Sequence, residues 1–114
     1  MTARCQLPQR RPHETFQFKH WDQAYTIGLG RDLVGDVREV FINTGKVGTQ
    51  MEVLARDSAV LLSIALQYGV PVEDMARAIT RDATGKPSGP IGALLEKIAA
   101  DEEATVARAV GDLE

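Results

Sequence analysis

The most apolar run of this sequence is Ser58-Ala59-Val60-Leu61-Leu62-Ser63-Ile64-Ala65-Leu66-Gln67-Tyr68-Gly69-Val70-Pro71. It predicts a helix from about Met51 to Tyr68. Gly69 can adopt the left-handed conformation that ends a helix, and Pro71 follows as a stop or a restart. We expect this helix to form the core of a small domain.

On a helical wheel, the polar residues of this segment form one stripe about 60° wide, made of Glu52, Arg56, Ser63 and Gln67. The remaining positions are mostly apolar, so the helix is expected to be buried on several sides. Leu61 lies at the centre of the expected buried arc. Asp57 and Ser58 also fall in this arc, and a buried carboxylate needs a cation or several hydrogen-bond donors.

Before this helix, alternating apolar residues predict three strands, at 15–19, 23–29 and 38–43. Their short connections indicate an antiparallel meander. After it, the pattern predicts a short helix from Val72 to about Thr80 and a last helix from near Pro90. The expected fold is therefore a two-layer α+β domain of order βββααα. We expect an extended arm over residues 1–13 and a single domain over 14–114.

Composition limits the classes of function. The 114 residues carry a formal net charge of −3, which argues against a dedicated nucleic-acid-binding protein. Basic residues gather in the arm, which we expect to be a solvated tail. No run approaches the length of a membrane span. Cys5 is the single cysteine, so no intrachain disulfide can form, and a cytoplasmic protein is expected.

Three segments in this order resemble the TSCPD domain: Glu39-Val40-Phe41-Ile42, Lys46-Val47-Gly48 and Leu66-Gln67-Tyr68-Gly69-Val70-Pro71. The resemblance runs from Leu7 to Gly89. It implies a domain that occurs near the C-terminus of vitamin-B12-dependent (class II) ribonucleotide reductases and as short free-standing proteins. Within the reductase this domain is not the catalytic part.

The chain departs from the family at the motif that gives it its name, Thr-Ser-Cys-Pro-Asp. The corresponding segment is Thr84-Gly85-Lys86-Pro87-Ser88, which has no cysteine. A metal or redox role of that cysteine therefore does not carry over. His13 and His20 form no zinc pattern, and no nucleophile elbow or Ser-His-Asp order is present. We expect no catalytic residues, no metal site and no cofactor.

Five residues are candidates for binding a ligand. Lys46 and Gly48 lie in a glycine-containing loop before a helix, where backbone amides and a lysine can meet an anion. The loop lacks the spacing of a P-loop, and a tight strand-to-helix turn is the simpler interpretation. Asp57 is expected to tie the helix to this loop, with Lys46 as a partner. Lys86 and Ser88 belong to a second polar loop.

Two hypotheses of function follow. The first is a free-standing, non-catalytic TSCPD-like module that is accessory to ribonucleotide reduction or binds a protein partner related to the reductase. The second is a regulatory domain that binds a nucleotide, a phosphate or another small anion. A third and less favoured hypothesis is an enzyme that uses Asp57. We also expect a homodimer through the strands or the C-terminal helix, because the apolar surface of a three-stranded sheet and of the stripe starting at Ile91 needs cover.

Overall fold

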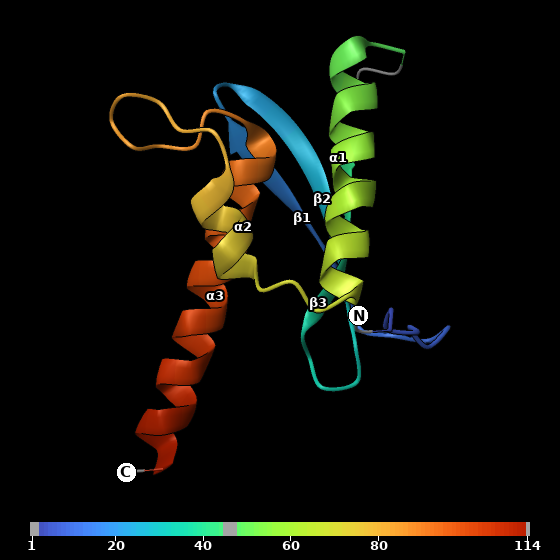
Figure 1. Cartoon of the computed structure of the whole chain (residues 1–114), viewed down its shortest axis with the longest axis vertical. Coiled ribbons are helices and arrows are strands. Elements are labelled where there is room, and N and C mark those ends of the chain that lie inside the picture. Colours follow the sequence, from blue (N-terminus) through green and yellow to red (C-terminus); the bar gives the residue numbers. More distant parts are fainter. Residues whose placement is uncertain (1–2, 45–47, 114) are drawn as a thin grey trace. The chain divides into compact units, whose positions relative to one another are not determined.

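A computed structural model describes residues 3–44 and 48–113. The chain divides into two compact units, Met1–Val70 and Pro71–Glu114, and each is described by itself. The first unit contains three strands and one helix, β1 (His13–His20), β2 (Gln23–Arg31), β3 (Val37–Asn43) and α1 (Gln50–Gln67). The second contains α2 (Val72–Ala78) and α3 (Pro90–Leu113) (Figure 1). The predicted α+β fold, with three antiparallel strands followed by three helices, is confirmed.

The three strands form an antiparallel meander in the order β1-β2-β3. Trp21 and Asp22 join β1 to β2 with φ angles of 48° and 64°, as a two-residue hairpin turn with a right-handed strand twist requires. Between β2 and β3, one carboxylate oxygen of Asp32 accepts from the backbone N–H groups of Val34, Gly35 and Asp36, each at 3.0 Å. Local backbone chemistry therefore fixes both hairpins.

The two faces of the sheet differ in chemistry. One face is apolar, because the register places Phe16 beside Ile27, and Ile27 beside Ile42. Tyr25 lies on the same face, and its burial raises the pKa of its phenol. The opposite face carries polar side chains and glycines. This separation follows directly from the period of two in the strand sequences.

Helix α1 begins and ends where its sequence predicts. The Thr49 hydroxyl accepts from the backbone N–H of Glu52 at 3.2 Å and caps the first turn. At the other end Gly69 has a φ of 86°, and its N–H donates to the Leu66 carbonyl. The N–H of Val70 donates to the Ala65 carbonyl and completes the cap.

The buried side of α1 is not the side that the wheel predicted. Leu61, expected at the centre of the core, has 69% of its surface exposed. The buried residues of α1 include two from the predicted polar stripe and several small or apolar ones: Glu52, Ala55, Ala59, Leu62, Leu66 and Gln67. The expectation of a helix buried on several sides, with Leu61 in the core, is wrong.

The reason is the strand beside which α1 lies (Figure 1). β3 is an edge strand, so some of its backbone groups have no neighbouring strand to bond. Ser63 and Gln67 supply the missing partners. The Val40 N–H donates to Ser63 Oγ at 2.8 Å, and Gln67 Nε2 donates to the Arg38 carbonyl at 3.1 Å. Ser63 and Gln67 of the polar stripe therefore face the sheet edge, and much of the apolar arc, Leu61 included, is left exposed.

The N-terminal stretch is attached to the first unit. Arg4 Nε donates to the Gln67 side chain at 2.6 Å, and the Cys5 N–H donates to the Gln67 carbonyl at 2.7 Å. Arg11 pairs with Glu39 at 2.5 Å. The expectation of a solvated tail is therefore wrong for Arg4 and Arg11, whose side chains bind Gln67 of α1 and Glu39 of β3.

In the second unit α2 packs on α3, and the apolar stripe of α3 is buried at Leu94, Leu95 and Ile98. Gly92 lets the loop approach α3 closely, because a Cβ at this position would lie 2.6 Å from Ile79 Cδ1 and 3.2 Å from Pro87 Cβ. Beyond Ile98 the described side chains of α3 are mostly exposed. No helix in the described part of the chain has the length and hydropathy to span a membrane.

Candidate functional site

The glycine loop before α1 is closed by its own helix. Lys46 lies outside the described residues, so its predicted role stays a prediction. The Gly48 N–H donates to Glu52 Oε2 at 2.6 Å, and the other oxygen of Glu52 accepts from Arg56 Nη2 at 2.6 Å. The backbone amide of Gly48, which the sequence suggested for binding an anion, therefore already binds the buried carboxylate of Glu52.

Asp57 is not buried. Its side chain lies on the exposed side of α1, so the premise of a buried carboxylate that needs a partner is wrong. The helical wheel correctly placed Asp57 among the apolar residues. It could not show which side of the helix faces the sheet. Pairing with Lys46 falls outside the described residues.

Lys86 and Ser88 lie in the second unit, in a loop that is held by backbone hydrogen bonds. The Lys86 N–H donates to Asp82 Oδ1 at 3.1 Å, and the Ser88 N–H donates to the Thr80 carbonyl at 2.9 Å. The Thr84 hydroxyl also donates to Asp82 Oδ1. This hydrogen bond makes the largest contribution to lowering the pKa of Asp82. The Lys86 side chain is exposed, whereas that of Ser88 is half-buried.

A groove of about 440 Å³ lies between α1 and β3, and sequence analysis did not anticipate it. Its walls combine apolar side chains with cations. Phe41 and Ile64 are among the former, and Arg4 and Arg56 are the latter. The groove lies where α1 packs alongside the edge strand β3, with Ser63 and Gln67 facing that strand rather than solvent.

A second hollow, of about 340 Å³, lies on the polar face of the sheet. Its lining includes Gly28 of β2, which has no side chain. A Cβ at Gly28 would lie 3.0 Å from His13 Nε2, so the missing side chain gives the imidazole its place over the strand. The His13 ring lies 5.9 Å from the Phe41 ring, and Phe41 lines both this hollow and the groove.

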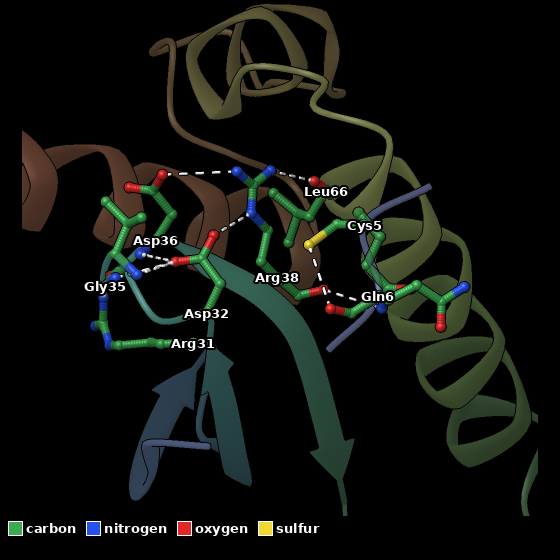
Figure 2. A network of polar contacts seen from close by, with 10 residues as sticks. Cys5, Gln6, Arg31, Asp32, Gly35, Asp36, Arg38 and Leu66 are labelled. Carbon is green, nitrogen blue, oxygen red and sulfur yellow. Dashed lines mark hydrogen bonds and ion pairs between the residues drawn. The ribbon is translucent and has the colours of Figure 1, made fainter. Parts of the chain in front are cut away.

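Arg38 ties the β2–β3 turn to the end of α1 (Figure 2). Its Nε donates to Asp32 Oδ2 at 2.9 Å and its Nη1 donates to the Leu66 carbonyl at 2.7 Å, while Asp36 Oδ2 lies 3.6 Å from Nη2. These carboxylates, Asp32 first, raise the pKa of Arg38. Burial raises the pKa of Asp32, but the bonds from Arg38 and from three backbone amides outweigh it, so the net pKa lies below the ordinary value.

Helix α1 carries exposed apolar side chains on the side away from β3, which we call the outer face. It comprises six large side chains that are each between 40 and 69% exposed: Met51, Val53, Leu54, Val60, Leu61 and Tyr68. Exposed apolar side chains gathered on one side of a helix are typical of a site of protein–protein contact. Asp57 lies on the same side of the helix.

Residues 3–44 and 48–113 contain no group of three side chains that could hold a metal ion. Among them, the polar contacts above tie elements to one another, and the groove, the hollow and the outer face are open to solvent.

The chain matches one family model and one known protein. The model of the TSCPD domain family matches residues 1–110. A vitamin B12-dependent ribonucleotide reductase of Agrobacterium fabrum (strain C58 / ATCC 33970) is 31% identical over 77 residues, which is 68% of this chain and 6% of the reductase. No solved structure matches the chain.

Proposed function

This chain belongs to the TSCPD domain family, and from that premise we propose that it is a non-catalytic accessory module of ribonucleotide reduction that works by binding protein. The outer face of α1 carries the proposal. Its leucines and valines are exposed although the helix has polar residues that could have faced water. A soluble domain that keeps such a surface open has a partner for it.

The link to ribonucleotide reduction rests on the family and on the similar reductase. The matched segment is a small part of that protein, 6% of its length, so the similarity concerns one segment and not the whole enzyme. The single cysteine, Cys5, fits a reducing compartment, and we place the module in the cytoplasm.

Binding to a B12-dependent ribonucleotide reductase tests this function. The chain is titrated into the purified reductase by isothermal calorimetry, alongside two variants. Leu61→Asp puts a charge on the outer face, whereas Leu33→Asp puts the same charge at a leucine that is 84% exposed but lies in the β2–β3 turn. We expect saturable binding by the native chain and by Leu33→Asp, and loss of binding by Leu61→Asp. Absence of binding by the native chain would overturn the proposal.

The groove between α1 and β3 supports a second candidate, the binding of a small anion such as a nucleotide or phosphate. Two guanidinium groups, of Arg4 and Arg56, line it together with apolar side chains and the carboxylate of Glu39. Arg4 also binds Gln67, and Arg56 binds Glu52, so an anion would compete with or add to these contacts. A thermal-shift series with inorganic phosphate and nucleotides tests it. A saturable rise in melting temperature that Arg4→Gln and Arg56→Gln each reduce supports an anion site. A flat response across the series rejects it.

A further inference from the structure

We propose that the groove between α1 and β3 binds a short acidic peptide in extended conformation, which pairs with the backbone of Ile42. This goes beyond the contact of the outer face with a reductase, and it gives the groove a different occupant from a free nucleotide or phosphate. The basis is one residue of β3 whose backbone groups point away from the sheet and have no hydrogen-bond partner within the described part of the chain.

The pairing of the strands decides which backbone groups of β3 point away from β2. In an antiparallel pair, the N–H and C=O groups of successive residues point alternately toward the partner strand and away from it. The Val40 N–H binds Ser63 of α1. The Arg38 carbonyl binds Gln67 of α1. Val40 and Arg38 therefore point away from β2, and so does Ile42, the next residue in this alternation, which lines the groove.

Helix α1 supplies no partner to Ile42. Residues four apart on a helix are separated by about 6 Å along its axis, and residues two apart on a strand by about 6.6 Å. Gln67 and Ser63 therefore meet alternate residues of β3, and Ala59 comes next in this series. Ala59 lines the groove with Ile42, and its methyl group cannot form a hydrogen bond. Within residues 3–44 and 48–113, the outward N–H and C=O groups of Ile42 are left without a partner.

An extended peptide is the complement of these two groups. One of its residues offers a C=O and an N–H at the spacing of a β-ladder, as when a strand is added to an exposed sheet edge. The volume of about 440 Å³ limits the occupant to a short segment. Phe41, Val60 and Ile64 provide apolar walls for the side chains that flank the paired residue.

The groove is less suited to a nucleobase. A base can also use a backbone N–H and C=O, but proteins commonly stack bases on aromatic side chains. Phe41 is the one aromatic residue among those that line the groove. Its ring packs at a tilt against His13, with 5.9 Å between the ring centroids. A peptide is therefore favoured over a nucleotide.

Charge selects the kind of peptide. Arg4 lines the groove and binds a neutral amide of α1, and no carboxylate within the described part of the chain pairs with it. The other cation, Arg56, is paired with Glu52. The carboxylate of Glu39 is paired with Arg11. The positive charge of Arg4 is thus left to favour a peptide that carries an acidic residue.

Nuclear magnetic resonance of the nitrogen-15-labelled chain reads the Ile42 amide directly. The probe is a capped pentapeptide, acetyl-Asp-Val-Thr-Val-Asp-amide. At millimolar peptide we expect a saturable downfield shift of the Ile42 amide proton, because it gains a hydrogen bond, and a smaller shift for Phe41, whose N–H points toward β2. The same peptide with lysine in place of aspartate should bind about tenfold more weakly. No shift with the acidic peptide, or equal binding of the two peptides, would overturn the proposal.

Two changes test the backbone pairing. A peptide with a methyl group on every amide nitrogen keeps its side chains and charges but has no backbone donor, so the Ile42 shift should be lost, and a retained shift overturns the proposal. In the chain, Ala59→Ser offers Ile42 a hydroxyl, as Ser63 does for Val40, and should weaken peptide binding about tenfold. Ala55→Ser, at a buried position of α1 outside the groove, should bind like the native chain. The methylated peptide decides the matter where Ala59→Ser does not fold.

The remaining outcomes separate this proposal from the functions proposed above. A shift of the Ile42 amide by adenosine triphosphate and not by the peptide assigns the groove to a nucleotide and overturns the peptide. Leu61→Asp, on the outer face, should bind the peptide like the native chain. Peptide binding without reductase binding overturns the accessory function alone, and reductase binding without peptide binding overturns the peptide site alone.

Discussion

The hydroxyl of Ser63 on α1 binds the backbone groups of Val40 on β3 that a neighbouring strand would otherwise bind. Its oxygen accepts from the Val40 N–H at 2.8 Å and lies 3.1 Å from the Val40 carbonyl oxygen. Ser63 Oγ is also within 2.8 Å of the Ala59 carbonyl of its own helix. One side chain thus protects an exposed sheet edge, which is otherwise a site for unwanted strand pairing.

Removing this hydroxyl should destabilise the chain. We expect Ser63→Ala to lower the free energy of unfolding by about 1–3 kcal/mol, because the Val40 N–H loses its partner in a half-buried place. Ser58→Ala, a change of the same kind at a half-buried position of the same helix, should have an effect within about 0.5 kcal/mol. Urea unfolding measures both. Equal losses in the two variants would show that the Ser63–Val40 contact contributes nothing.

Two adjacent leucines of α1 test which side of the helix is the core. Leu62 is 6% exposed and Leu61 is 69% exposed. Leu62→Ala should cost about 2–5 kcal/mol through lost burial and the cavity that remains. Leu61→Ala should cost less than about 0.5 kcal/mol, because its side chain is already largely exposed. Chemical unfolding at low protein concentration compares them, and a larger loss for Leu61→Ala would reverse our assignment of the two sides.

Asp32 should make the free energy of unfolding depend on pH in the acidic range. Its pKa in the folded chain lies below the ordinary value, so the stabilisation it gives is present above the unfolded pKa, about 4, and is lost as the pH falls through the lower folded pKa. We expect Asp32→Asn to be less stable than the native chain at pH 7, and the difference to shrink below about pH 4. Thermal unfolding between pH 7 and pH 2 follows this difference. A difference that stays constant over the range would contradict the assignment.

The glycines of α3 offer a matched pair. Gly92 lies against Ile79 and Pro87, whereas a Cβ at Gly111 would meet nothing within 4 Å. Alanine favours a helix over glycine by about 1 kcal/mol, so Gly111→Ala should raise stability by up to that amount. Gly92→Ala should lower it by about 1–2 kcal/mol, because the added methyl overpacks the loop. Calorimetric melting of both variants gives the sign of each change, and two changes of the same sign would contradict the packing at Gly92.

The sequence by itself determined the order of the elements and their bounds to within about two residues. The period of two in the strands, the cap at Thr49 and the stop at Gly69 are local features, and local hydrogen bonds and backbone conformations enforce them. The motifs between Glu39 and Pro71 also sufficed to indicate the family that the comparisons show. The two faces of the sheet followed from alternation alone.

Only the tertiary structure decided which side of α1 faces inward. A helical wheel shows that polar and apolar residues lie on different sides, but it does not show what each side meets. Here the neighbour is the edge of β3, whose N–H and C=O groups need partners, so Ser63 and Gln67 turn inward with the small residues Ala55 and Ala59. Leu61 and Asp57 turn outward as a consequence. Because that choice depends on unpaired backbone groups in a strand distant in sequence, no pattern within the helix could reveal it.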